Sequence, residues 1–109
     1  MKKKYIVQKK AVELKNTKNN KIYRRYLLSH DKNLYSVNFF RLEILKSNKD
    51  YHANKYHQFC YVLSKRSVVK IDNKKFNLKK GDSFYIKPFT KHTCVSKGSK
   101  ILITQIKLN

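Results

Sequence analysis

The chain has 109 residues, enough for one domain near the lower size limit for a self-sufficient core. Hydrophobic residues make up 40% of it and aromatic residues 13%, so it is too apolar to be a disordered chain. No apolar run is as long as a membrane-spanning helix, and the basic start is not followed by the apolar stretch of a signal peptide. We therefore expect a single folded domain without a membrane span.

The charge is strongly one-sided. Lysine and arginine total 27 against 6 acidic residues, a formal net charge of +21. A biased base composition enriches lysine, but it does not deplete the acids, whose codons it also permits. A positive field of this size attracts polyanions and strengthens phosphate contacts by counterion release. The charge predicts a nucleic acid or chromatin partner, and a merely solvated basic surface is the alternative.

The two cysteines, Cys60 and Cys94, are far apart in the sequence. They lack the paired spacing of a zinc module or a disulfide framework. They indicate a reducing, intracellular compartment.

The predicted elements are short β-strands along the whole chain. Apolar and polar residues alternate over residues 35–45, which places Phe40, Leu42 and Ile44 on one face of a strand. The expected strands are 5–14, 22–28, 35–45, 59–63, 67–72, 75–78, 83–87, 92–96 and 101–108. Polar turns are expected at 15–21, at 29–33 and at Asp72-Asn73-Lys74.

Many short strands separated by polar turns are typical of a sandwich or barrel. No window has the 3.6-residue apolar period of a capped helix, so little helix is expected. The sequence predicts an all-β chain in which residues 1–34 form basic N-terminal strands that pack on a barrel formed by residues 35–109.

Two segments carry a family resemblance. Residues 61–72 have the pattern of a β-hairpin, and residues 79–88 read as a tight turn followed by a strand. Gly81 suits a positive φ in that turn, and Asp82 suits the start of the strand. These segments resemble the core of the cupin superfamily over residues 57–106, which implies a small double-stranded β-helix, or jelly-roll, barrel. Phe89 stands where members of that superfamily commonly have a glycine.

The resemblance extends to the spacing of the cupin metal site, His-x-His-x3-Glu with a distant histidine four residues after a proline. The corresponding residues here are His52, Asn54, Gln58 and His92. In a metal cupin, imidazoles and a carboxylate bind one divalent ion, whereas here amides replace one imidazole and the carboxylate. We therefore expect four degenerate ligand positions and no bound metal, with one divalent metal ion as the alternative.

Histidines can also carry protons without a metal. The segment His52-Ala53-Asn54-Lys55 resembles the His-Ala-His-Lys segment of the sugar-nucleotide 3,4-ketoisomerase cupins, but Asn54 cannot carry a proton. A non-enzymatic domain is therefore expected. The alternative is a small cupin of isomerase or epimerase type with His52 and His92 as catalytic residues, or a sugar- or metal-binding protein.

A second resemblance concerns the region after residue 80. Residues 81–88 and the tail 96–106 look similar to the cupin dimerisation domain of centromere protein C, which has lost its metal ligands. This resemblance implies a non-enzymatic homodimer that binds chromatin and contributes to kinetochore assembly at the centromere. It leaves room for a small-molecule ligand in the barrel. The expected location is the nucleus if the resemblance holds and the cytoplasm otherwise.

Strand alternation also predicts an interface. If Gln58 and Cys60 point into the barrel, then Phe59, Tyr61 and Leu63 point outward. Large outward apolar side chains need covering, and a two-fold symmetric dimer is the commonest arrangement that covers them. We expect a homodimer through Phe59, Tyr61 and Leu63, with coverage by residues 1–34 as the alternative.

Basic residues near the N-terminus are the expected DNA contacts. They are Lys2, Lys3, Lys4, Lys9, Lys10, Lys21, Arg24 and Arg25. Such contacts go mostly to phosphates, which implies binding that is salt-sensitive and weakly sequence-specific.

Overall fold

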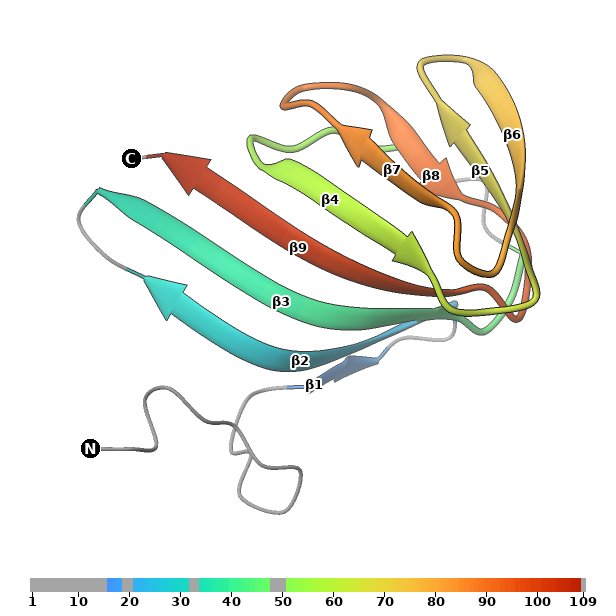
Figure 1. The fold of residues 1–109 in the computed structure, drawn as a ribbon, viewed down its shortest axis with the longest axis horizontal. Coiled ribbons are helices and arrows are strands. Elements are labelled where there is room, and N and C mark those ends of the chain that lie inside the picture. Colours follow the sequence, from blue (N-terminus) through green and yellow to red (C-terminus); the bar gives the residue numbers. More distant parts are fainter. Residues whose placement is uncertain (1–15, 19–20, 32–33, 48–50, 109) are drawn as a thin grey trace.

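Two antiparallel β-sheets curve around a common interior in a computed structural model that describes residues 16–18, 21–31, 34–47 and 51–108 (Figure 1). The strands are β1 (Asn16–Lys18), β2 (Ile22–Asp31), β3 (Tyr35–Ile44), β4 (His57–Val62), β5 (Arg66–Ile71), β6 (Lys74–Lys79), β7 (Ser83–Ile86), β8 (His92–Cys94) and β9 (Lys100–Leu108). Within these residues there is no helix, and so none long and apolar enough to cross a membrane. The prediction of an all-β barrel is confirmed.

The larger sheet has six strands in the order β1-β2-β3-β9-β4-β7, and the smaller has three in the order β6-β5-β8. The last strand, β9, lies between β3 and β4, so that Ile103 is opposite Phe40 on one side and Cys60 on the other. This central position ties the C-terminal residues into the middle of the larger sheet. The smaller sheet faces it and closes the barrel (Figure 1).

The core forms where the inward side chains of both sheets meet. Phe40, Leu42 and Ile44 are buried, as their alternation predicts, and Val69 of the smaller sheet packs in the same cluster as Ile101 of the larger. Burial of such side chains stabilises a fold by about 1.5–3 kcal/mol each, so this cluster supplies much of the driving force for closing the barrel.

Backbone conformation explains the tight turns. Asp72 and Asn73 both have positive φ, as the two-residue loop of a twisted hairpin requires, and the expected turn there is confirmed. Gly81 has φ of 95°, which confirms its predicted role. Phe89 has φ of 64°, a left-handed conformation that a bulky residue adopts only under constraint.

Two predicted turns are wrong in part. β1 lies inside the turn expected at 15–21, because its pairing with β2 uses main-chain groups and needs no apolar pattern. β2 continues to Asp31, beyond the strand end expected at residue 28. Its last residues pair with β3 after a bulge, and polar contacts such as Ser36 Oγ to Asp31 Oδ1 (2.6 Å) hold them there. The strand expected at 5–14 lies outside the described residues.

Candidate ligand site

A cavity of about 260 Å³ lies inside the barrel. Most of its wall is apolar and comes from the core, including Phe40, Leu42 and Ile103. The polar side chains that line it are Arg24, His52, Asn54, Gln58, His92, Thr93 and Gln105. An apolar wall with a few placed polar groups is the usual make-up of a small-molecule site.

The four residues at the predicted metal positions all line this cavity, so the spacing correctly brings them together. The main chains of His52 and His92 pair directly, with His52 N donating to His92 O (3.1 Å) and His92 N donating to His52 O (2.9 Å). Their rings meet edge to face with centroids 4.3 Å apart. His92 is buried, whereas His52 is exposed at the mouth of the cavity.

His92 is held in one neutral form. Its Nδ1 lies 2.8 Å from the carbonyl oxygen of Thr90, which can only accept, so Nδ1 carries the proton and Nε2 is left as an acceptor. The amide Nε2 of Gln58 then donates to His92 Nε2 at 3.0 Å. Burial lowers the pKa of His92 below its usual 6.5, which favours the same neutral state.

The hydrogen-bond chain continues to Gln105. Its amide Nε2 donates to Gln58 Oε1 at 2.7 Å, and Gln58 itself is 4% exposed. Because the Thr90 carbonyl fixes the proton on His92, it also fixes which end of the Gln58 amide faces each neighbour. The chain Gln105–Gln58–His92–Thr90 is thus a network with defined donors and acceptors, in which Gln58 and His92 are buried.

Asn54 is committed to local structure. Its Oδ1 accepts a hydrogen bond from the main-chain N–H of Tyr56 (3.0 Å), and its main-chain carbonyl accepts one from Phe89 N (2.7 Å). The second contact joins the loop before β4 to the turn that precedes β8, and so helps hold Phe89 in its left-handed conformation.

These side chains do not fit a resident metal ion. The lone pair of His92 Nε2 is used by the Gln58 amide, and the Asn54 oxygen is used by Tyr56 N. Among the described residues there is no cluster of three or more histidine, cysteine or acidic side chains suited to a metal. Neutral amides are weak ligands for a divalent cation compared with the carboxylate that they replace.

Both cysteine side chains also line the cavity, and both are free thiols. Burial raises the pKa of Cys60 to about 12, and the neighbouring Cys94 contributes a smaller increase in the same direction. Burial likewise raises the pKa of Cys94, against the opposing effect of hydrogen bonds from Ser67 and Ser99. Both remain protonated at neutral pH and are therefore poor nucleophiles.

Of the predicted DNA contacts, Arg24 and Arg25 are described and lie on opposite faces of the sheet. Lys2, Lys3, Lys4, Lys9 and Lys10 lie outside the described residues. Lys21 is half-buried at the start of β2, and its carbonyl accepts a hydrogen bond from Leu45 N (2.6 Å). Arg24 lines the cavity, whereas Arg25 pairs with Arg41 on the opposite, outer face of the sheet.

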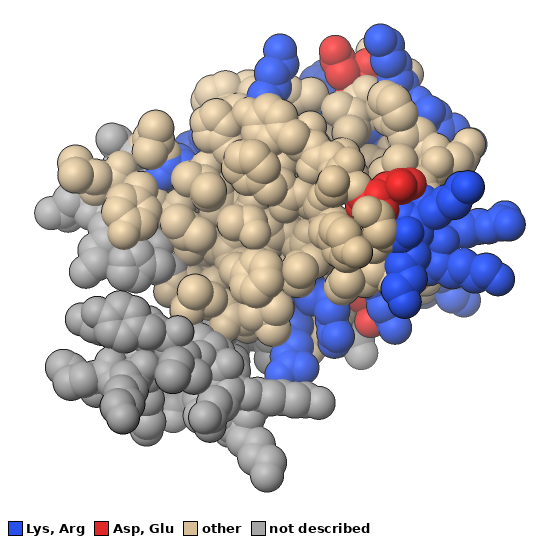
Figure 2. All heavy atoms as spheres, viewed as in Figure 1, with Lys and Arg blue, Asp and Glu red and all other residues tan. Residues whose placement is uncertain are grey.

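Exposed cations instead gather where the ends of several strands meet. We call this set the basic end; it consists of Lys65, Arg66, Lys79, Lys80 and Lys100. Main-chain contacts join its turns, for example Lys80 N to Lys65 O (3.3 Å) and Leu63 N to Lys100 O (2.8 Å). Figure 2 shows lysine and arginine side chains concentrated along that side of the molecule.

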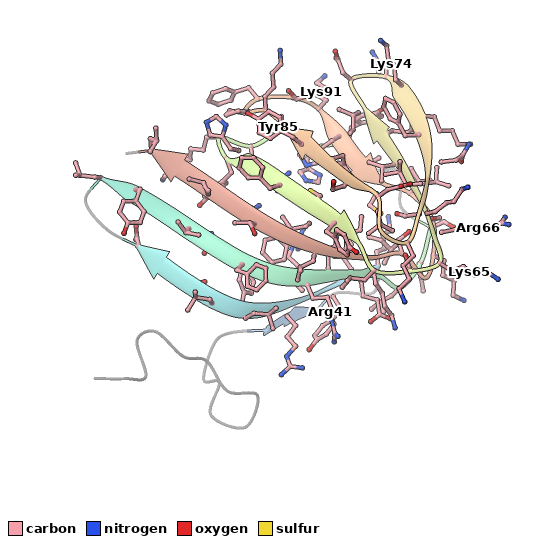
Figure 3. All side chains as sticks on the ribbon, in the orientation of Figure 1. Arg41, Lys65, Arg66, Lys74, Tyr85 and Lys91 are labelled. Carbon is pink, nitrogen blue, oxygen red and sulfur yellow. The ribbon has the colours of Figure 1, made fainter. Side chains whose placement is uncertain are left out.

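Two of the three predicted interface residues share an outer face. Phe59 and Tyr61 on β4 are 50% and 45% exposed, and Tyr85 on β7 lies beside Phe59 with ring centroids 5.1 Å apart (Figure 3). Leu63 follows the end of β4 and is half-buried. β2 is part of the same sheet, between β1 and β3, and does not cover this face, which is largely free of charge in Figure 2.

Two residues of the site are missing from the sequence-based prediction. The sequence-based prediction names Arg24 only as a DNA contact and gives Gln105 no role, whereas both line the cavity. Strand alternation, in which every second side chain points to the same face, could have identified both residues. Arg24 is two residues from each of the inward residues Ile22 and Tyr26, and Gln105 follows the inward residues Ile101 and Ile103 on β9 at the same spacing.

Solved structures share this fold. An RmlC-like cupin from Shewanella frigidimarina is 22% identical, with a TM-score of 0.66 over 86% of this chain and 83% of that one. The Cnp3 cupin domain of Schizosaccharomyces pombe is 10% identical, with a TM-score of 0.62 over 89% of this chain and 70% of that one. At these identities the likeness is one of fold alone.

Sequence comparison supports the same assignment. Uncharacterized protein MJ1618 of Methanocaldococcus jannaschii is 44% identical over 42 residues, which cover 38% of this chain and 34% of that protein. The profile of the cupin domain matches residues 42–104, more than half of the chain. With the barrel and the residue spacing of its cavity, this match shows that the chain belongs to the cupin family.

Proposed function

We propose that this cupin is a non-enzymatic protein that binds a small organic molecule inside its barrel without a metal ion. The observation that carries this proposal is the Gln105–Gln58–His92–Thr90 chain, which gives one wall of the cavity fixed, neutral hydrogen-bonding groups. The apolar remainder of the wall favours burial of a ligand.

The size of the cavity limits the ligand. A cavity of about 150 Å³ is enough to hold benzene. The larger volume of about 260 Å³ here therefore admits a molecule of roughly 6 to 12 non-hydrogen atoms.

The groups around the cavity favour binding over catalysis. Both thiols are protonated, and His92 is neutral with both ring nitrogens engaged. Among the described residues no carboxylate lines the cavity beside His92, which disfavours general acid–base chemistry at that histidine.

The proposal is tested by screening the full chain, after dialysis against EDTA, with a panel of small organic acids, amides and alcohols of matched shape. Binding is followed by calorimetry and by amide chemical shifts. Ile103→Phe fills the cavity, and its neighbour Leu102→Phe places the same ring on the outer face as a control. We expect binding that survives EDTA and Leu102→Phe but is lost in Ile103→Phe. Binding that requires added metal, or that Ile103→Phe leaves unchanged, contradicts the proposal.

A second candidate function is favoured by the distribution of charge. We propose, as this second candidate, that the chain is a homodimeric scaffold that binds nucleic acid or chromatin. The basic end would be the phosphate-binding surface, and the outer face with Phe59, Tyr61 and Tyr85 would be the dimer contact. Cations gather at the basic end, while the outer face around Phe59 and Tyr85 is largely uncharged in a chain of net charge +21. Two copies can meet at such a face with the least repulsion between their lysines. The more specific form of this proposal is a scaffold of the centromere protein C type. It rests on the sequence resemblance over residues 81–88 and 96–106 and on a fold shared with the Cnp3 cupin domain.

The nucleic-acid part is tested by fluorescence anisotropy with duplex DNA at about 50 and 200 mM salt, since phosphate-dominated binding weakens steeply with salt. Glutamine at Lys65, Arg66 and Lys80 removes three charges from the basic end, and glutamine at Lys74, Lys75 and Lys91 removes three exposed charges elsewhere. Figure 3 labels Lys65 and Arg66 of the first set and Lys74 and Lys91 of the second. Equal losses in the two triple variants contradict a localised surface.

The dimer is tested by sedimentation velocity. Phe59→Lys is compared with Phe76→Lys on the smaller sheet, because both side chains are about half exposed. We expect only Phe59→Lys to shift the protein toward monomer. A wild-type chain that sediments as a monomer at every concentration tested contradicts the dimer.

A further inference from the structure

A cation faces the interior of the barrel. Arg24 lies between Ile22 and Tyr26 on β2, and all three line the cavity. Arg24 also pairs with Leu42 of β3, whose side chain is 8% exposed and lines the same cavity. The half-buried side chain of Arg24 is thus on the barrel side of the sheet, opposite to the face that carries Arg25.

This cation has no counter-charge in the described part of the chain. The acidic residues there are Asp31, Glu43, Asp72 and Asp82, and none of them lines the cavity. The Arg24 guanidinium makes no ion pair or side-chain hydrogen bond with a described residue. An arginine cannot lose its charge by deprotonation, so a partly desolvated guanidinium is stabilised by an anion brought to it.

The surroundings of Arg24 favour a single carboxylate as that anion. A guanidinium binds a carboxylate through two parallel N–H···O bonds. Arg24 is the one cation among the described residues that line the cavity, beside apolar walls and the neutral amides of Gln58 and Gln105. A group with one negative charge and a mostly apolar body satisfies all of these features.

We propose that the ligand of the barrel is a small organic monocarboxylate whose carboxylate pairs with Arg24. This inference rests on the proposed function, because it names the chemical class of the molecule that the cavity binds. The amides of Gln58 and Gln105 then face the body of the ligand and select among carboxylates by their polar substituents.

The test uses matched pairs from the panel above, each an acid and the amide of the same skeleton, titrated calorimetrically into the full chain. Wild type is expected to bind the acid about 10- to 100-fold more tightly than its amide. Arg24→Gln is expected to abolish this preference. Arg24→Lys is expected to keep part of it, because lysine retains the positive charge but cannot make the bidentate hydrogen bonds of a guanidinium. Arg25→Gln makes the same charge change on the outer face and serves as the control. Urea unfolding of each variant confirms that it is folded.

Each outcome separates the two proposals. If acids and amides bind wild type equally, or if the preference for acids survives in Arg24→Gln, the role of Arg24 is wrong while ligand binding stands. If Arg25→Gln loses the preference as fully as Arg24→Gln, the effect is one of net charge and the pairing is wrong. If inorganic phosphate or chloride competes as well as the acids do, the organic body is not recognised. If no member of the panel binds wild type, both proposals fail.

Discussion

Replacing Gln58 with glutamate should reverse the way in which stability depends on pH. In the wild type, burial lowers the pKa of His92 below 6.5 in the folded state, so the unfolded chain binds more protons between the two pKa values. By linkage, the stability that neutral His92 contributes is fully present above pH 6.5 and is lost as the pH falls through the lowered folded-state pKa.

The variant changes the sign because a carboxylate accepts where the amide donated. His92 Nδ1 keeps its proton and donates it to the Thr90 carbonyl, so the Nε2 lone pair faces a carboxylate oxygen unless Nε2 is protonated. The pKa of His92 in folded Gln58→Glu should therefore be raised above 6.5. The stability that protonated His92 contributes in the variant is then present below pH 6.5 and is lost as the pH rises through the raised pKa. Above that raised pKa, the unprotonated Nε2 and the carboxylate face each other as two acceptors, which destabilises the variant by about 1–3 kcal/mol relative to the wild type.

Urea unfolding between about pH 5 and pH 8 measures this effect for wild type, Gln58→Glu and the neutral control Gln58→Met. The destabilisation of Gln58→Glu should grow with pH, at no more than about 1.4 kcal/mol per pH unit for one titrating group. The destabilisation of Gln58→Met should be nearly independent of pH, because no charge is added. Parallel curves for wild type and Gln58→Glu across this range would refute the assignment of a Gln58 donor on a neutral His92.

Three further predictions concern the rest of the barrel. Phe89→Gly should raise the free energy of unfolding by about 0.5–1 kcal/mol, because glycine adopts the left-handed φ without strain and the exposed ring contributes little packing. This gain outweighs the opposing increase in the conformational entropy of the unfolded chain. An unchanged or lower urea midpoint would contradict this. Cys60 and Cys94 should react with a thiol reagent at neutral pH only as fast as the chain unfolds, since burial raises both pKa values; rapid labelling of the folded protein would show a thiolate. Phe40→Ala should cost about 3–5 kcal/mol by creating a core cavity, measured by the same unfolding assay, and a loss below about 1 kcal/mol would mean that this ring is not central to the core.

Much of the barrel can be predicted from the sequence because strands that are buried on one face alternate visibly. The inward set Phe40, Leu42 and Ile44 and the outward Phe59 and Tyr61 follow from a period of two. β1 cannot be found in this way, since an edge strand is held by main-chain hydrogen bonds that any side chain permits.

The candidate site is predictable in position but not in detail. The match to the cupin spacing indicates that His52, Asn54, Gln58 and His92 lie together, and all four line one cavity. The amides at two of these positions indicate that the site differs from the cupin metal site. The hydrogen-bond chain to Gln105 cannot be read from spacing, because β9 is distant in sequence and meets β4 only through sheet topology. Composition places Arg24 among the basic candidates for DNA contact, and only the period of two along its strand indicates that it lines the cavity.

Elemental analysis of the purified, untagged chain for iron, manganese, zinc, nickel and copper tests the central claim most directly, namely that the cupin frame here is a neutral site without a resident metal. Because Gln58 and Asn54 are committed to hydrogen bonds within the protein, metal should be far below stoichiometric, and His52→Ala combined with His92→Ala should not change it. Near-stoichiometric metal that disappears in that double variant would contradict the account and place a metal ion at the centre of the barrel.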